Sequence, residues 1–271
     1  MKATVVVDNR AACGMDGEWG LCFFIEYNGK KILLDAGASD LFLSNGKKMG
    51  IPVEQADFAV LSHAHYDHAD GLRYFFRAND HAMCFLRESC GENCYKKKGW
   101  FQKEYIGISK GILSEFESRI RRVSGDYTLS PGVYLIPHKK AGLEKIGVRE
   151  RMYRREGRRW IPDDFSHEQS LVFDTENGLV IFNSCSHGGA DLIIREVGET
   201  FPDKKIAAMI GGFHLFNKTE AEVREFAGRV RETGIRKVYT GHCTGEAAFE
   251  ILRQELGERV VQLGVGLVIE V

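Results

Sequence analysis

The distribution of apolar and polar positions along the chain predicts alternating strands and helices. Near the start, β-branched and aromatic residues fill three runs, at 4–7, 21–25 and 31–34, and the last two flank an Asn-Gly pair at 28–29. Asn-Gly between two apolar runs is typical of a two-residue β-hairpin. Residues 41–49 have apolar positions at helical spacing, and a Gly-Ile-Pro stop signal follows them. The first part of the chain is therefore expected to form a strand, a hairpin and a helix.

The second half of the chain continues this alternation. Two apolar runs, 170–173 and 178–182, surround another Asn-Gly turn and predict a second hairpin. Further elements are expected in this order: a helix after Asp191, a strand over 205–210, a helix over 219–233, a strand over 237–239, a helix capped by Thr244 and ending near 256, and one or two strands over 260–271. Thr219 and Glu222 have the spacing of a capping box. The pattern predicts an α/β fold, and a single domain over residues 1–271 because it contains no repeat and no low-complexity linker.

Residues from about 90 to 160 have a poorer pattern and are expected to form a basic insertion. They contain Lys96-Lys-Lys98 and a series of closely spaced arginines at positions 149, 151, 154, 155, 158 and 159. The preferred interpretation is a solvated insertion. The alternative is a lid whose guanidinium groups bind an anionic substrate, since arginine makes bidentate contacts with phosphate and carboxylate groups.

Composition limits the partners. The 271 residues carry a formal charge of −1, which does not indicate nucleic acid or an anionic membrane as a partner. The N-terminus lacks the apolar region of a secretory signal, so a cytoplasmic location is expected. The seven cysteines are an odd number, which argues against a disulfide framework, and the spacing of Cys90 and Cys94 fits neither a zinc knuckle nor a thioredoxin motif. The sequence leaves open whether the protein forms a homodimer.

The most informative motif is His63-Ala-His65-Tyr-Asp67-His68, which directly follows the apolar run 58–61. It places four candidate metal ligands within six residues. A turn that leaves a strand can direct these side chains at one point, whereas a single helix face cannot. Imidazole and carboxylate together suit zinc, iron or manganese better than calcium or magnesium. The motif therefore predicts a metal site.

Three more groups of candidate ligands follow apolar runs: Cys185 with His187, then His214, and then His242. Ligand-binding residues of α/β sheets gather where strands end at their carboxyl edge. A chain that ends four separate strands in His, Cys or Asp is most simply explained by one shared site. The sequence thus predicts that these residues and residues 63–68 meet after folding.

The same motifs resemble those of the metallo-β-lactamase superfamily. The resemblance rests on segments 18–22, 32–37, 62–72, 183–189, 211–215 and 240–245, which occur in the expected order. Together they are similar to the branch that contains archaeal dihydropteroate-synthase-like proteins of methanopterin biosynthesis and many bacterial metal-dependent hydrolases. The resemblance implies a four-layer αββα sandwich, with two mixed β-sheets flanked by helices.

The resemblance also implies a set of ligands for two metal ions. His63 and His65 would bind the first metal, and Asp67, His68 and His242 the second. Cys185 stands where the superfamily usually has Asp, so it is either a ligand or a buried apolar residue. The remaining ligand is His187, or alternatively His167. His214 would bind substrate or transfer a proton, and Asp35 would support the histidine loop from behind.

The function implied is that of a hydrolase with two divalent metal ions, zinc being preferred and iron or manganese being alternatives. Water held between two metal ions loses a proton near neutral pH, and the resulting metal-bound hydroxide would attack the substrate. Asp67 and His214 are the expected catalytic residues. A small anionic substrate, preferably a phosphoester or phosphodiester, is expected. The alternatives are an enzyme similar to a pterin-pathway synthase or transferase, and a redox or non-catalytic di-metal sensor of the same fold.

Overall fold

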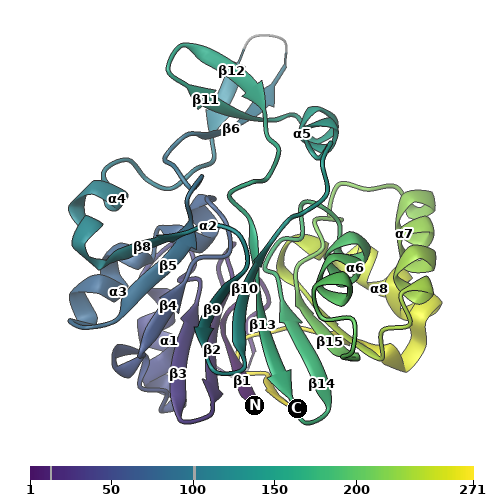
Figure 1. The fold of residues 1–271 in the computed structure, drawn as a ribbon, viewed down its shortest axis with the longest axis horizontal. Coiled ribbons are helices and arrows are strands. Elements are labelled where there is room, and N and C mark those ends of the chain that lie inside the picture. The colour runs from purple at the N-terminus through teal and green to yellow at the C-terminus, as the bar shows by residue number, and fades with distance from the viewer. Residues whose placement is uncertain (13, 100–101) are drawn as a thin grey trace.

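The computed structural model describes residues 1–12, 14–99 and 102–271. Its centre consists of two seven-stranded mixed β-sheets that pack face to face (Figure 1). The strands of the first sheet, in spatial order, are β18 (Val268–Glu270), β1 (Lys2–Val7), β2 (Cys22–Tyr27), β3 (Lys30–Leu34), β4 (Phe58–Val60), β5 (Met83–Arg87) and β8 (Ile120–Val123). Strands β3, β4, β5 and β8 are parallel, so their carboxyl ends share one edge of the sheet.

The second sheet has the same mixed character. Its strands are β17 (Val260–Gln262), β16 (Lys237–Thr240), β15 (Ile206–Gly211), β14 (Gly178–Phe182), β13 (Gln169–Thr175), β10 (Val133–Pro137) and β9 (Tyr127–Ser130). Strands β14 to β17 are parallel. The loops that follow these strands therefore also emerge at one edge.

Helices cover the outer faces of both sheets (Figure 1). On the side of the first sheet lie α1 (Leu41–Met49), α2 (Tyr66–Ala69), α3 (Leu72–Ala78) and α4 (Ile112–Glu115), and on the side of the second lie α6 (Ala190–Thr200), α7 (Glu220–Glu232) and α8 (Glu246–Leu256). Short 3₁₀ turns occur at η1 (Val53–Gln55), η2 (Glu117–Arg119), η3 (His242–Thr244) and η4 (Gly257–Arg259). The resemblance implied a four-layer αββα arrangement, and the structure confirms this fold.

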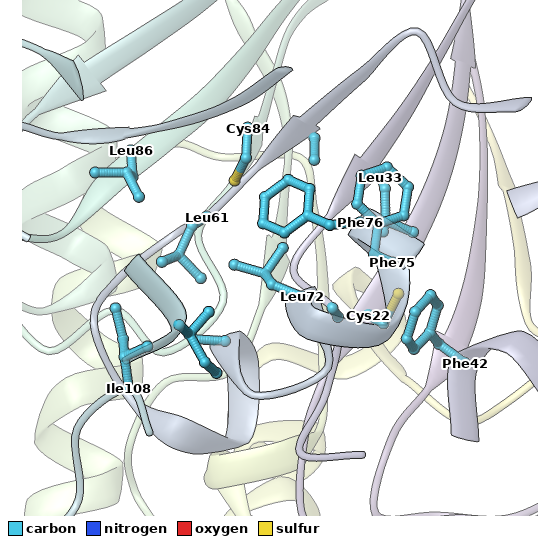
Figure 2. Close-up of a cluster of buried hydrophobic side chains, with 14 of the residues drawn as sticks. Cys22, Leu33, Phe42, Leu61, Leu72, Phe75, Phe76, Cys84, Leu86 and Ile108 are labelled. Carbon is cyan, nitrogen blue, oxygen red and sulfur yellow. The ribbon is translucent and has the colours of Figure 1, made fainter. Parts of the chain in front are cut away.

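Three clusters of buried apolar side chains lie between the sheets and helices of the sandwich. Between the sheets, side chains such as Phe23 and Phe182 meet with ring centroids 5.4 Å apart. A second layer joins the first sheet to α1 and α3, where Phe42, Leu72 and Phe75 are completely or almost completely buried (Figure 2). The third joins the second sheet to α6, α7 and α8. Burial on this scale is the main favourable contribution to folding.

A third, antiparallel sheet projects beyond the sandwich, at the top of Figure 1. Its four strands are β12 (Arg159–Pro162), β11 (Met152–Glu156), β6 (Cys94–Lys98) and β7 (Gln102–Tyr105), and α5 (Glu144–Glu150) precedes β11. The sequence pattern did not predict this sheet. The structure also divides the span expected as a basic insertion, because β8 belongs to the first large sheet while β9 and β10 belong to the second.

Most elements predicted from the sequence are confirmed, including both hairpins and the capping box of α7 at Thr219 and Glu222. The predicted cap of the last helix is wrong. α8 begins after Gly245, without a side-chain cap, and Thr244 lies inside η3. Its hydroxyl instead accepts a hydrogen bond from the backbone N–H of Phe213. Thr244 therefore ties together two loops of the edge described below.

The cysteines agree with the expectation of no disulfide framework. Cys22, Cys84, Cys90, Cys94, Cys185 and Cys243 are all free and buried. Cys13 lies outside the described residues.

Among the helices that the structure describes, none is both long enough and apolar enough to cross a bilayer.

Candidate metal centre

The candidate ligands lie in loops at the carboxyl ends of parallel strands. His63 and His65 follow β4, and Asp67 and His68 belong to the short helix α2 that comes next. On the other sheet, Cys185 and His187 follow β14, His214 follows β15, and His242 begins η3 after β16. Their rings are close together: the centroids of His63 and His187 are 5.1 Å apart, and those of His68 and His242 are 4.9 Å apart. The structure thus brings the predicted residues from the two sheets to one place.

Four donor atoms form a compact set around His68. Its Nε2 lies 3.1 Å from His242 Nε2, 3.3 Å from Cys185 Sγ and 3.8 Å from Asp67 Oδ2, and His242 Nε2 lies 3.4 Å from the same Asp67 oxygen. In a tetrahedral zinc site with bonds of about 2.0–2.3 Å, donor atoms are about 3.3–3.8 Å apart. The spacing of His68, Cys185 and His242 is close to that of ligands of one divalent ion, and Asp67 lies beside the two imidazoles of this set.

Hydrogen bonds behind the imidazoles turn their free nitrogens toward the centre. His68 Nδ1 lies 2.8 Å from Asp35 Oδ2, and His242 Nδ1 lies 2.9 Å from Asn9 Oδ1. Carboxylate and amide oxygens only accept hydrogen bonds, so each Nδ1 carries the proton and each Nε2 presents a lone pair. Such outer partners fix the tautomer and the ring orientation of metal-binding histidines. Sequence analysis predicted this supporting role for Asp35 and missed Asn9.

Two facing lone pairs at 3.1 Å repel each other unless a cation lies between them. Without a metal, a proton has this role: burial lowers the pKa of His242, but nearby Cys243 and Asp67 outweigh it and raise the pKa to about 9. Burial likewise acts to raise the pKa of Asp67, but His68 and His242 keep it well below its usual range. The pocket is therefore electrostatically suited to a positive charge.

A second set of donors contains His63, His65 and His187. The Nε2 atoms of His63 and His65 and both ring nitrogens of His187 are buried, with no hydrogen-bond partner among the described residues. Burial lowers the pKa of His65 to about 3 and holds those of His63 and His187 well below their usual range. Buried polar atoms are almost always paired, so neutral, unpaired imidazole nitrogens at one point fit a metal ion.

His167, the alternative ligand, has a different environment. Its Nδ1 accepts a hydrogen bond from the backbone N–H of Ala64, and its Nε2 lies 3.1 Å from Asp163 Oδ2 and 3.7 Å from Cys94 Sγ. Both of its nitrogens are thus occupied, whereas those of His187 are free to bind an ion. The hydrogen bond to Ala64 connects His167 to the backbone between His63 and His65. His167 also lies in a group with His65, Cys94 and Asp163 whose donor atoms are all within 4.8 Å of one another, so both histidines remain candidate ligands.

His214 stands at the side of this centre. Its ring centroid is 4.5 Å from that of His187, and both of its ring nitrogens are buried without a partner in the part of the chain that the structure describes. Two glycines precede it closely, and a side chain at Gly212 would come within 2.5 Å of Cys243 Sγ. The backbone at Gly212 therefore approaches the Cys243 sulfur closely.

Several residues at this edge adopt left-handed backbone conformations that are unusual outside glycine. The φ angles are +58° at Asp35, +50° at His214 and +47° at His242. Each costs of order 1–3 kcal/mol and persists only where the surroundings impose it. Such strain collects at functional sites, which agrees with a preorganised set of ligands.

A cavity of about 320 Å³ opens beside His187 and His214. Its charged lining consists of Arg149, Lys218 and Arg229 with Glu150, Asp191, Glu222 and Glu225. Acidic partners accompany the cations; Arg229, for example, lies 3.0 Å from Asp191. Of the closely spaced arginines at positions 149–159, Arg149 is the one that lines this cavity within the described ranges, and Arg154 is buried against Asp163 and Asp164.

Sequence analysis also missed a buried ionic network behind His187. His138 lies between two carboxylates, with Nε2 at 2.8 Å from Glu168 and Nδ1 at 3.0 Å from Glu196. The other oxygen of Glu168 accepts the backbone N–H of His187. His138 stands alone in the sequence, without a neighbouring motif, so only the fold reveals its connection to the site.

Known proteins with similar sequences and folds include metal-dependent enzymes of one superfamily. A family model described as the metallo-β-lactamase superfamily matches residues 17–82. A relative from Methanocaldococcus jannaschii, 7,8-dihydropterin-6-methyl-4-(beta-D-ribofuranosyl)-aminobenzene-5'-phosphate synthase, is 28% identical over 93% of this chain and 89% of its own. An uncharacterised protein of the same organism is 26% identical over 92% of this chain and 93% of its own. The crystal structure of Tm1679, a metal-dependent hydrolase of the β-lactamase superfamily, superposes with a TM-score of 0.85 at 28% identity, over 100% of this chain and 99% of that one.

The chain thus has an αββα sandwich in which His, Cys and Asp side chains from the loops of both sheets lie close together. The family model over residues 17–82 and the superposed hydrolase structure thus make the chain similar to proteins of the metallo-β-lactamase superfamily, and the relatives align with it over nearly its whole length.

Proposed function

We propose that this protein is a hydrolase that depends on two divalent metal ions, with zinc as the preferred ion. We place the first ion at His63 and His187, with His65 beside them, and the second at His68 and His242, with Asp67 beside them. Cys185 belongs to both groups. Two divalent ions would supply a nucleophilic hydroxide at neutral pH and a positive charge next to the reacting group.

One observation carries this proposal. Donor atoms from both sheets face one another at ligand spacing, while the opposite sides of the rings are fixed by Asp35, Ser62 and Asn9. An arrangement in which outer hydrogen bonds fix the tautomers and the inner nitrogens stay free suits metal binding better than a purely structural polar cluster.

The protein's own residues have defined roles in this proposal. Asp67 orients the nucleophile from the edge of the second ligand set, and His214 donates a proton to the leaving group or polarises the group under attack. His214 is placed for this because it lies beside His187, lines the 320 Å³ cavity and has ring nitrogens without a partner among the described residues. A small anionic substrate, preferably a phosphoester, is proposed because the metal centre attracts negative charge. The mixed charges of the cavity lining neither add to this preference nor oppose it.

The experiment is a hydrolysis screen with bis(p-nitrophenyl) phosphate and simple esters, on protein loaded with zinc, manganese or iron. We expect turnover that chelation abolishes and added metal restores. His81→Ala, which changes an exposed histidine, is the matched control for His63→Ala. Full turnover in a preparation verified to be metal-free would refute the proposal.

A second candidate is a pterin-pathway synthase-like reaction, which the 28% identity to the archaeal synthase over most of the chain favours. A chromatographic assay for the product after which that relative is named would separate the two candidates. Product formation without hydrolysis of the screening substrates would replace the first candidate with the second. A cytoplasmic location and a possible homodimer remain predictions from the sequence.

A further inference from the structure

Cys243 is a buried thiol that the proposed reaction does not use. Its Sγ lies 3.3 Å from Cys185 Sγ, and it accepts a hydrogen bond from the backbone N–H of His214. The residue occupies the loop next to His242, and Gly212 has no side chain because the Cys243 sulfur fills that space. The fold thus brings two sulfurs together at the inner end of the metal centre.

An imidazole completes this pair. Donor atoms of Cys185, Cys243 and His214 all lie within 4.8 Å of one another. His214 has two buried ring nitrogens for which the described chain offers no partner, and its left-handed backbone holds the residue in place. Buried nitrogens without a partner are costly unless a ligand occupies them.

We infer that Cys185, Cys243 and His214 form a third, thiolate-rich ligand set for a thiophilic divalent cation. The set shares Cys185 with the two sets already described, in which the other donors are imidazole and carboxylate. Each thiol gives up its proton to solvent when it binds the ion. Because thiolates select zinc and softer ions over magnesium and manganese, this corner of the centre discriminates among metals.

The inference rests on the metal centre of the proposed function, but not on the reaction catalysed there. It differs from a purely structural role for Cys243, in which the thiol would only accept the His214 N–H and fill space beside Gly212. A serine at position 243 preserves that acceptor and nearly the same volume while it removes the sulfur ligand. Cys243→Ser therefore separates the two roles.

The test uses cadmium, whose bonds to thiolates give a charge-transfer absorption in the ultraviolet. Metal-free protein, kept reduced with a non-thiol reductant, is titrated with Cd²⁺ alone. We expect the wild type to develop the absorption of two thiolates, and Cys243→Ser to develop about half of it per saturated protein, since one of two sulfur ligands is lost. His214→Gln should keep the thiolate absorption but require more cadmium to reach it.

Cys84→Ala is the matched control, because Cys84 lies in an apolar cluster and belongs to none of the ligand sets (Figure 2). It should absorb as the wild type does. If Cys243→Ser does not fold, X-ray absorption spectroscopy of the wild-type cadmium protein counts the sulfur ligands directly. Full absorption in Cys243→Ser, or a single sulfur ligand in the wild type, would overturn the inference alone. Failure of the wild type to take up any cadmium would overturn the proposed metal centre as well.

Discussion

Histidine tautomers at the metal centre follow from individual hydrogen bonds. Ser62 donates its hydroxyl hydrogen to Asp35 Oδ2 and is therefore left to accept from His63 Nδ1. The second oxygen of that aspartate's carboxylate accepts the Ser62 backbone N–H. One buried carboxylate thus sets the orientation of both His63 and His68, which belong to different ligand sets. An asparagine in its place would leave one of these donors without an acceptor.

We therefore expect Asp35→Asn to lower the affinity for both metal ions. Loss of an outer partner of a metal-binding histidine typically costs 10- to 100-fold in affinity, a range we expect here because the amide has only one acceptor oxygen. Competition with a chromophoric chelator measures this change. Asp203→Asn, at an exposed turn, is the control. Wild-type affinity in Asp35→Asn would contradict the role assigned to Asp35.

Substitutions at His187 and His167 should have different effects. His187→Ala removes a ligand, so we expect the number of tightly bound metal ions to fall from two to one. His167→Ala breaks hydrogen bonds to Ala64 and Asp163 and should cost about 1–3 kcal/mol of stability, while both metals remain bound. Metal analysis after gel filtration and urea unfolding measure the two effects. The reverse pattern would make His167 the ligand.

The ionic network of His138 links α6 to the loop that carries His187. Burial acts to lower the pKa of His138, but Glu168 and Glu196 outweigh it and raise the pKa to about 9. Glu196 lies on α6 and also accepts the backbone N–H groups of Lys139 and Lys140, and Glu168 holds His187. The protonated imidazole therefore connects a helix to a metal-binding loop.

This network predicts a pH-dependent stability. A histidine whose folded pKa exceeds its unfolded value of 6.5 stabilises the fold fully below pH 6.5, and that contribution is lost as the pH rises through about 9. The rise in the pKa of His138 corresponds to a contribution of roughly 3 kcal/mol to the free energy of unfolding. Urea unfolding of chelator-treated protein should show wild type and His138→Gln well separated near pH 6 and converging above about pH 9. His81→Gln, at an exposed site, should behave as the wild type does. Equal separation at both values would contradict the assignment.

The sequence predicted the elements with strong patterns and those next to motifs. Hairpins, the capping box and the strands that end in ligands are local signals, because turn chemistry and apolar periodicity act over a few residues. The sheet formed by β6, β7, β11 and β12 was missed because its strands are polar and partly exposed. In β6, for example, three lysines follow one another at 96–98. Asn9, His138 and Cys243 were missed as participants because their partners lie far away in the chain, 233 residues away for Asn9 and His242.

The proposed metal centre takes its ligands from loops of both halves of the sandwich. His63, His65, Asp67 and His68 follow the first sheet, and Cys185, His187 and His242 follow the second. An ion bound to residues of both sheets stabilises the folded state, because the unfolded chain cannot offer the same set of ligands. The facing Nε2 atoms of His68 and His242, 3.1 Å apart, lie at this junction.

Metal removal should therefore destabilise the whole protein rather than the loops alone. At a free metal concentration 1,000-fold above Kd, binding stabilises by about 4 kcal/mol per site. We expect the Tm of the chelated protein to rise steadily with added zinc, in one cooperative transition. The double variant His63→Ala/His68→Ala, which lacks a ligand from each of the two ion sites of the proposed function, should show a much smaller rise, because only the set of Cys185, Cys243 and His214 stays intact. A Tm that is independent of zinc in the wild type would mean that the two sheets are not joined through a bound ion.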